Sequence, residues 1–255
     1  MKKLLTLLFL FSAFISNAQR TIFTGQNNYV APVVSANIIT TDLLLYLDAG
    51  NVSSYPGSGN TWYDLSTNVN HGTLATSSMA NTASNPKKFT FNGTSNYVSF
   101  TPSKFNVPYT GKTVIVAAKL NSNFGANVYR ALFGNPSAYS RNFNFYIYQN
   151  GSGYKIHFAD AGINGFSDLL TLATNQWYVF AVTQENNTVK FFVNGVLVSS
   201  TSGPLSQYQS STEEYVGRAD NYWYGDIGSI FIYKRGLSEV EILQNFNALK
   251  SRFGL

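Results

Sequence analysis

Short runs rich in Val, Ile, Phe, Tyr and Thr, separated by clusters of Gly, Asn and Ser, occupy most of the chain after residue 42. They are residues 43–47, 88–92, 96–101, 113–119, 130–133, 144–149, 154–159, 177–184, 188–193 and 227–233. Many short strand-like runs at this spacing are typical of a β-sandwich or β-barrel, because β-branched and aromatic residues suit a pleated surface while Gly and Asn make turns. A region of this length is commonly one domain with a single core.

Two hairpins are specified by their turns. Asn194-Gly195 separates residues 188–193 from the apolar residues 196–198, and Asn-Gly between alternating strands favours a two-residue hairpin turn. Residues 150–153 join 144–149 to 154–159 in a similar way. Phe191, Phe192 and Val193 follow one another without a polar residue, which predicts a strand buried on both faces.

The C-terminus changes from a strand pattern to a helix pattern. Ser238 and Glu241 form a capping box, in which each side chain bonds the backbone of the other residue. Behind it Ile242, Phe246, Leu249 and Phe253 recur on one helical face, and Gly254 follows as the stop signal. We expect a short helix that packs this stripe on the edge of the sandwich, with membrane or partner binding by the stripe as the less favoured alternative.

The N-terminus has the pattern of a secretory signal peptide over residues 1–18. Lys2 and Lys3 precede an apolar run over residues 4–15, and Ser16-Asn17-Ala18 is a small-x-small cleavage site. Residues 19–41 are polar and without sustained period, so we expect an N-terminal arm or spacer followed by the folded domain at 42–255. The absence of Cys excludes disulfides and a lipid-modified Cys at the cut site. The sequence therefore predicts a secreted or cell-surface protein.

Charge and hydropathy argue against a nucleic-acid partner and against a membrane-spanning segment. The net charge is +5, but Lys and Arg never occur more than two in succession, whereas a nucleic-acid surface clusters them. The apolar run of the signal peptide is shorter than the roughly 20 residues of a membrane span, and no later stretch approaches that length. We expect neither a nucleic-acid partner nor a membrane span.

An ordered set of motifs resembles the bacterial laminin G-like modules of the concanavalin A-like superfamily. The motifs are Leu45-Tyr-Leu-Asp-Ala-Gly50, Thr61-Trp-Tyr-Asp-Leu-Ser66, Asn70-His-Gly-Thr-Leu74, Phe91-Asn-Gly93, Tyr97-Val98, Phe192-Val-Asn-Gly195, Val216-Gly-Arg218 and residues 225–238. The resemblance implies an all-β fold, an antiparallel jelly-roll β-sandwich with the short C-terminal α-helix added. It also implies a secreted module for binding or adhesion.

Calcium is the metal hypothesis, because it takes oxygen ligands from Asp, Asn and backbone carbonyls. Asp48, Asp64 and Asp226 stand beside the family motifs and are the candidate ligands. The alternative, which we favour, is that Asp48 and Asp64 bond the backbone of their own turns. Members of the resembling family often carry an acidic pair where this chain has Gly228 and Ser229, and this departure also argues against a metal. We expect that no cofactor is required.

Catalytic groups in a recognisable spacing are missing from the sequence. A glycoside hydrolase needs two carboxylates facing one substrate, whereas Glu213 and Glu214 are adjacent and would point to opposite faces of a strand. The histidines are His71, in a turn, and His157, inside a strand-like run. No Gly-x-Ser-x-Gly elbow accompanies them. We expect a protein that is not an enzyme.

Carbohydrate is the expected ligand class, given the resemblance, the export signal and an aromatic content of 16%. The candidate site is the segment 218–224, which combines rings with planar polar groups. Its candidate binding residues are Arg218, Asp220, Asn221, Tyr222 and Trp223, with Tyr139 beside Arg141 as a second candidate. Trp62 and Trp177 are assigned to packing.

Three functions follow in order of preference. The first is a non-catalytic module that binds extracellular or cell-surface glycans. The second is a structural or adhesive module with a protein partner. The third is a glycoside hydrolase with a non-standard site. A concave groove lined by rings and amides would favour the first, a flat apolar patch the second, and converging carboxylates the third.

Overall fold

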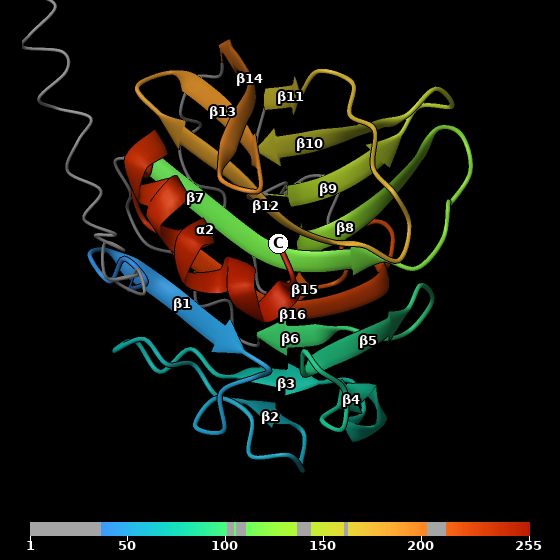
Figure 1. Ribbon diagram of the computed structural model, residues 1–255, viewed down its shortest axis with the longest axis vertical. Helices are drawn as coiled ribbons and strands as arrows, with labels where there is room; N and C mark the ends of the chain where they lie inside the picture. Colours follow the sequence, from blue (N-terminus) through green and yellow to red (C-terminus); the bar gives the residue numbers. More distant parts are fainter. Residues whose placement is uncertain (1–36, 101–104, 106–110, 137–143, 161–162, 203–212) are drawn as a thin grey trace, which may run out of the picture. The chain divides into compact units, whose positions relative to one another are not determined.

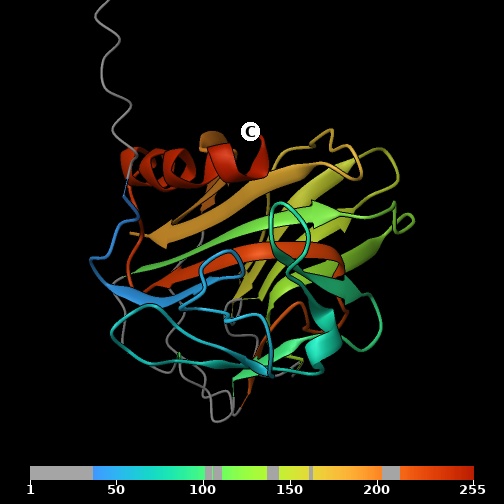
Figure 2. The same ribbon diagram turned by 60° about the horizontal axis from the view of Figure 1, so that its bottom comes forward.

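The computed structural model describes residues 37–100, 105, 111–136, 144–160, 163–202 and 213–255. Within these residues the fold is two antiparallel β-sheets of eight strands each, with one α-helix at the C-terminal end. Figures 1 and 2 show the two sheets stacked, with the helix lying over one of them. The expected fold, an all-β antiparallel sandwich with a short C-terminal helix, is confirmed.

Sheet A has the strand order β14-β13-β12-β7-β16-β5-β4, and β1 also pairs with β16. Its strands are β1 (Leu43–Asp48), β4 (Ala80–Asn81), β5 (Lys88–Asn92), β7 (Gly111–Leu120), β12 (Trp177–Glu185), β13 (Thr188–Val193), β14 (Val196–Ser202) and β16 (Tyr224–Tyr233). A single 3₁₀ turn among the described residues, η1 (Ser77–Met79), precedes β4. Asn194 and Gly195 both have positive φ at the β13–β14 turn, so the predicted Asn-Gly hairpin is confirmed.

Sheet B has the strand order β11-β10-β9-β8-β15-β6-β3-β2. Its strands are β2 (Thr61–Trp62), β3 (Gly72–Leu74), β6 (Val98–Phe100), β8 (Val128–Gly134), β9 (Asn144–Gln149), β10 (Tyr154–Asp160), β11 (Ile163–Phe166) and β15 (Glu214–Val216). Four of them, β8 to β11, follow one another in the chain and lie side by side in the sheet (Figure 1). They form a continuous platform from one stretch of sequence.

The main core lies between the sheets, and strand alternation fills it. Along β9, Phe145 and Ile147 face this core while Tyr146 faces away from it. Trp62, assigned to packing from the sequence, is fully buried in the same cluster. Phe191 also lies in this core, whereas its neighbour Phe192 lies in a second cluster on the other face of sheet A. The prediction of a strand buried on both faces is therefore confirmed for β13.

Helix α2 (Glu239–Phe253) has the predicted capping box between Ser238 and Glu241, and Gly254 ends it in the left-handed conformation. Its stripe packs on the outer face of sheet A, against residues such as Phe231 and Trp177. The expectation of packing on the edge of the sandwich was wrong. Because the middle strands of sheet A carry apolar side chains on both faces, the helix covers a face that would otherwise be exposed to water.

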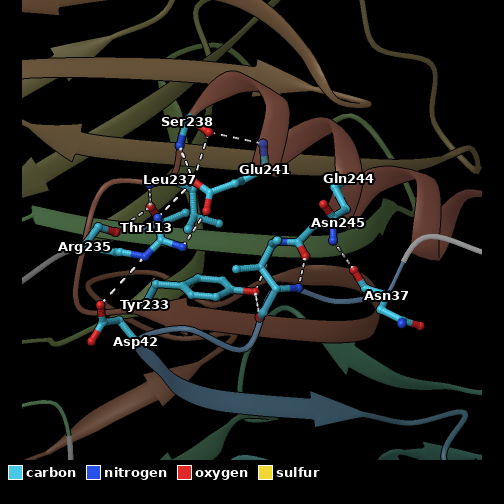
Figure 3. Close-up of polar contacts among 11 residues, drawn as sticks. Asn37, Asp42, Thr113, Tyr233, Arg235, Leu237, Ser238, Glu241, Gln244 and Asn245 are labelled. Atoms are coloured by element: carbon cyan, nitrogen blue, oxygen red, sulfur yellow. Dashed lines mark hydrogen bonds and ion pairs between the residues drawn. The ribbon is translucent and has the colours of Figure 1, made fainter.

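A polar network at the N-terminal end of α2 fixes the helix to the sheet (Figure 3). The guanidinium of Arg235 donates to both carboxylate oxygens of Glu241, at 2.9 and 2.6 Å, and its Nε lies 3.9 Å from the carboxylate of Asp42. These charge-assisted bonds lower the pKa of Glu241 to about 2. The helix is thus held by an ion pair as well as by its apolar stripe.

The same helix binds the first described residues of the chain. The side chain of Gln244 donates to the carbonyl of Asn37 at 2.8 Å, and the amide of Ile39 donates to Asn245 Oδ1 at 2.9 Å (Figure 3). The hydroxyl of Tyr233 donates to the carbonyl of Ile39 at 2.9 Å. Residues 37–39, placed in the N-terminal arm by the sequence analysis, therefore pack with the domain. In the described part of the chain no helix has the length and apolarity to cross a bilayer.

Candidate functional site

A cavity of about 310 Å³ opens on the outer face of sheet B, the face turned away from the main core. The residues that line it come from the four-strand platform and from the loop between β15 and β16. They are Tyr129, Tyr146, His157, Ala159, Phe166, Asp220 and Asn221. The volume lies at the lower end of the range of about 300–1,000 Å³ that is usual for small-molecule sites.

Strand register places the rings of the cavity in one row. His157 of β10 is paired with Tyr146 of β9 on one side and with Phe166 of β11 on the other. The ring of His157 lies 4.2 Å from Phe166 with an interplanar angle of 20°, and 5.4 Å from Tyr146 with an angle of 21°. The three rings therefore form a stacked ladder across three strands. Tyr129 of β8 lies against this ladder, 5.1 Å from His157.

The polar wall of the cavity is the tip of the β15–β16 loop. The amide of Ala219 donates to the carbonyl of Asn221 at 3.2 Å, and the amide of Trp223 donates to the carbonyl of Gly217 at 2.8 Å. These bonds close a tight turn that leaves Asp220 and Asn221 exposed at its tip. Of the residues predicted from the sequence, these two are brought to the cavity.

A hydrogen-bonded relay holds Asp220 to sheet B. The buried amide nitrogen Nδ2 of Asn144 donates to the Tyr146 hydroxyl at 2.8 Å, and this hydroxyl donates to Asp220 Oδ2 at 3.3 Å. Asn144 is itself fixed, because its Oδ1 accepts a bond from the amide of Asn135 at 2.8 Å. The carboxylate is therefore oriented by a chain of partners that begins inside the protein.

Arg218 and Tyr222 form a cluster of their own beside the cavity. The guanidinium of Arg218 lies over the rings of Tyr215, Tyr97 and Tyr222, at 4.5, 5.1 and 5.5 Å, a geometry that favours cation–π attraction. Burial and a hydrogen bond to Glu213 raise the pKa of Tyr215 to about 12. Arg218 and Tyr222 therefore stabilise the loop and do not line the cavity.

Trp223 is fully buried in the main core, so the prediction that its ring stacks on a ligand was wrong. The segment is extended where it enters β16, and neighbouring side chains of an extended chain point to opposite sides. Trp223 takes the inward position, while Tyr224 is 37% exposed. The second candidate, Tyr139 with Arg141, lies outside the described residues.

The three candidate calcium ligands are separately engaged by protein groups. Asp48 pairs with Arg252 and accepts the Gly50 amide at 2.7 Å. Asp226, with 2% of its side chain exposed, lies 2.7 Å from the ammonium of Lys88 and 2.9 Å from that of Lys119.

Asp64 is engaged by backbone amides. Its carboxylate accepts bonds from the amides of Tyr46, Ser66 and Asn70 at 2.8, 2.8 and 2.9 Å. No group of three or more acidic, His or Cys side chains with metal-binding geometry occurs among the described residues.

Gly228, one of the two departures from the family pattern, has a packing reason. A Cβ on this residue would lie 2.4 Å from Cε1 of Phe253 on α2. The register of β16 against β7 also shifts between Ile227 and Ser229, which is a β-bulge. Any side chain at position 228 would collide with the helix, so the acidic residue of the family pattern does not fit here.

The cavity residues on the strands were not among the candidates predicted from the sequence. Residue His157 was noted only as part of a strand, and β11, which carries Phe166, was not predicted. A usable signal was present, because Tyr146 and Tyr148 alternate with Phe145 and Ile147. Glu214 is buried and Glu213 is exposed, consistent with the predicted opposite directions of this adjacent pair.

Comparisons with known proteins agree with this architecture. The family model of the concanavalin A-like lectin/glucanases superfamily, laminin G type, matches residues 92–243. No curated protein matched the chain.

Several solved structures share the fold at low sequence identity. A sialidase of Trypanosoma rangeli has 14% sequence identity to this chain and a TM-score of 0.61. The match covers 84% of this chain and 34% of the sialidase chain. Domain 4 of the arabinanase AbnA of Geobacillus stearothermophilus, solved with arabinotriose, has 15% identity and a TM-score of 0.55, covering 80% of this chain and 98% of the domain. The binding domain of botulinum neurotoxin DC, solved with a sialylated ligand, has 14% sequence identity and a TM-score of 0.60. The match covers 83% of this chain and 52% of the neurotoxin chain. The chain thus spans about a third of the sialidase.

Proposed function

Since the chain belongs to the concanavalin A-like lectin/glucanase superfamily, we propose that it is a non-catalytic, secreted or cell-surface module that binds carbohydrate in the cavity on sheet B. The observation that carries the proposal is that the aromatic rings on sheet B and the polar tip of the β15–β16 loop line the same cavity. Binding sites for small molecules combine apolar and aromatic walls with a few converging polar groups. The ladder with Tyr129 supplies the first, and Asp220 with Asn221 supplies the second.

The chemistry of a saccharide suits both parts of this cavity. Its C–H groups pack against apolar ring surface, and its hydroxyls donate to Asp220 or exchange hydrogen bonds with the amide of Asn221. A bond from a sugar hydroxyl to a carboxylate is charge-assisted and stronger than one between neutral groups. The relay through Tyr146 fixes this acceptor before a ligand arrives, which reduces the ordering cost of binding.

Two observations support a role without catalysis or a metal. Asp220 is the one carboxylate among the described residues that line the cavity, whereas glycoside hydrolysis ordinarily uses two. The candidate metal ligands Asp48 and Asp226 are paired with protein cations. The arabinanase domain that was solved with arabinotriose is a precedent for saccharide binding on this architecture. The match with this chain covers almost the whole of that domain.

The test is a glycan array probed with the full chain, with and without a calcium chelator. We expect binding to one or more saccharides that persists under chelation and is lost in Tyr129→Ala and Phe166→Ala. Tyr63→Ala is the matched control, since Tyr63 is an exposed tyrosine that does not line the cavity. If both cavity variants still bind saccharide, the binding site lies outside this cavity. If the protein binds no saccharide, the proposed function is rejected.

A second candidate, a module that binds a protein partner, is favoured by exposed apolar side chains near α2. Val240 and Leu243 of the helix are 75% and 44% exposed, and Val196 at the start of β14 is 63% exposed. A Cβ on Gly195 would contact Leu243, so the β13–β14 turn and this part of the helix are neighbours. If this surface carries the function, Leu243→Glu will abolish capture of a partner while leaving saccharide binding unchanged.

A further inference from the structure

We infer that the cavity on sheet B selects neutral saccharides and rejects those that carry a carboxylate or sulfate. This inference rests on the proposed function and adds the chemical class of the ligand. Its starting point is the charge of the lining. Among the described lining residues Asp220 is the acidic one, and none is Lys or Arg.

Three described cations that neighbour lining residues in the chain or on the same strands do not line the cavity. Arg218, two residues before Asp220, lies over three tyrosine rings. Arg130, next to Tyr129 in β8, donates to the carbonyls of Gly93 and Tyr222 at 3.2 and 3.0 Å. Lys155 stands opposite Tyr148 in the backbone register of β9 and β10 and does not line the cavity. An anionic sugar would therefore meet Asp220 without a counter-charge from Lys or Arg among the described lining residues.

The position of Asp220 makes this repulsion specific to the cavity. Its carboxylate is held at the wall by the Tyr146 hydroxyl, so it cannot turn away without losing that bond. Two like charges a few ångströms apart near a protein surface repel each other, and salt weakens this repulsion. A neutral sugar in the same place instead donates a hydroxyl hydrogen to the carboxylate.

Among the solved structures of similar fold, domain 4 of the arabinanase AbnA is covered over 98% of its length, and it was solved with arabinotriose, a neutral saccharide. The charge of the cavity lining points to ligands of the arabinotriose type, which carry hydroxyls alone.

The experiment measures binding of the full chain to pairs of saccharides, in which the second member has an added acidic sugar or a carboxylate in place of a primary alcohol. Suitable pairs are lactose and 3′-sialyllactose, and oligogalactose and oligogalacturonate, titrated by calorimetry at pH 8, where an ordinary histidine is neutral. Any saccharide that binds on the array is added with its acidic counterpart. We expect the neutral member to bind at least about tenfold tighter than the acidic one at low salt. The difference should shrink as salt is raised, because salt screens the repulsion.

Two variants attribute the preference to the cavity wall. Asp220→Asn keeps the shape and removes the charge, so the tenfold difference should fall to about twofold or less. Asn221→Arg adds a counter-charge and should bring acidic members into measurable binding. Asp168→Asn, at an exposed acid that does not line the cavity, is the matched control and should change nothing.

The outcomes separate this inference from the function on which it rests. If the acidic members bind as tightly as the neutral ones and Tyr129→Ala abolishes both, the function stands and the selectivity is overturned. If the preference survives Asp220→Asn in a variant whose circular dichroism is unchanged, its assigned cause is overturned. If no saccharide binds, the function fails and the selectivity fails with it.

Discussion

The hydroxyl of Tyr146 donates a hydrogen bond to Asp220, 74 residues later in the chain, at 3.3 Å. This bond joins the middle of the platform to the loop that supplies the polar wall. The position of the loop is therefore coupled to the sheet, and the cavity is preformed on both sides.

Tyr146→Phe removes this coupling while keeping the ring. We expect saccharide binding to weaken several-fold, because Asp220 loses its fixed direction. Stability should fall by about 1–3 kcal/mol, since the buried Nδ2 of Asn144 loses an acceptor. Calorimetric titration and urea unfolding measure the two effects. Unchanged affinity in the variant would mean that the relay does not orient the wall.

Trp223→Phe separates the core from the site. Because the indole is fully buried in the main core, the substitution should destabilise the fold by about 0.5–3 kcal/mol. The affinity of the folded protein should stay the same. Phe166→Ala should show the opposite pattern, with lost binding and a smaller loss of stability. Unfolding curves and titrations on both variants test this contrast, and a direct loss of affinity in Trp223→Phe would contradict the assignment.

Gly228→Ala should destabilise the protein by about 1–3 kcal/mol, the usual cost of overpacking. The added methyl group would meet the ring of Phe253, 2.4 Å away in the present arrangement. Phe253→Leu creates space at the same place, so the double variant should be more stable than the sum of the single effects predicts. A double-mutant cycle by urea unfolding measures this coupling. Additive effects would show that the helix does not require Gly228.

The ion pair between Arg235 and Glu241 predicts a stability change at acid pH. The pKa of Glu241 is lowered from 4.5 to about 2 by the bonds from Arg235. A depressed folded-state pKa means that the stabilisation is present above about pH 4.5 and is lost as the pH falls toward 2. Glu241→Gln keeps a capping-box residue but should remove this part of the pH dependence. Unfolding free energies of both proteins between pH 2 and 6 provide the comparison, and parallel curves would contradict the prediction.

Asp226→Ala should destabilise the protein by about 3–5 kcal/mol, because it leaves the ammonium groups of Lys88 and Lys119 without their buried partner. For each of the two proteins, we expect the melting temperature in calcium to equal the melting temperature in chelator. Differential scanning calorimetry in both buffers tests this. A calcium-dependent rise in the wild type that Asp226→Ala abolishes would assign a metal to this carboxylate.

Local sequence signals predicted the elements whose structure depends on neighbours in the chain. The capping box at Ser238 and Gly254 set the two ends of α2, and Asn194-Gly195 set the β13–β14 turn. The adjacent Phe191 and Phe192 indicated burial on both sides. The identity of the covering layer did not follow, because the stripe of α2 fits an edge or a face equally well until the sheet has been assembled.

The candidate site could be predicted only in part, for a related reason. Asp220 and Asn221 lie in a turn-forming segment, so they could be found from their own neighbourhood. The rings of Tyr146, His157 and Phe166 become a site only when strand register places them in one row. Alternation shows that Tyr146 faces away from Phe145, but it does not show which of the two faces meets water. The same ambiguity of direction led to the wrong role for Trp223.

The bonds that α2 makes to Asn37 and Ile39 bear on how the domain can be attached to other structures. Leu255 at the C-terminus packs against the same apolar cluster as Ile39, so both ends of the described domain lie on the helix-covered side of sheet A. The cavity lies on the outer face of the opposite sheet. A support, fusion partner or circular-permutation linker joined at Asn37 or Leu255 would therefore leave the face that carries the cavity directed outward.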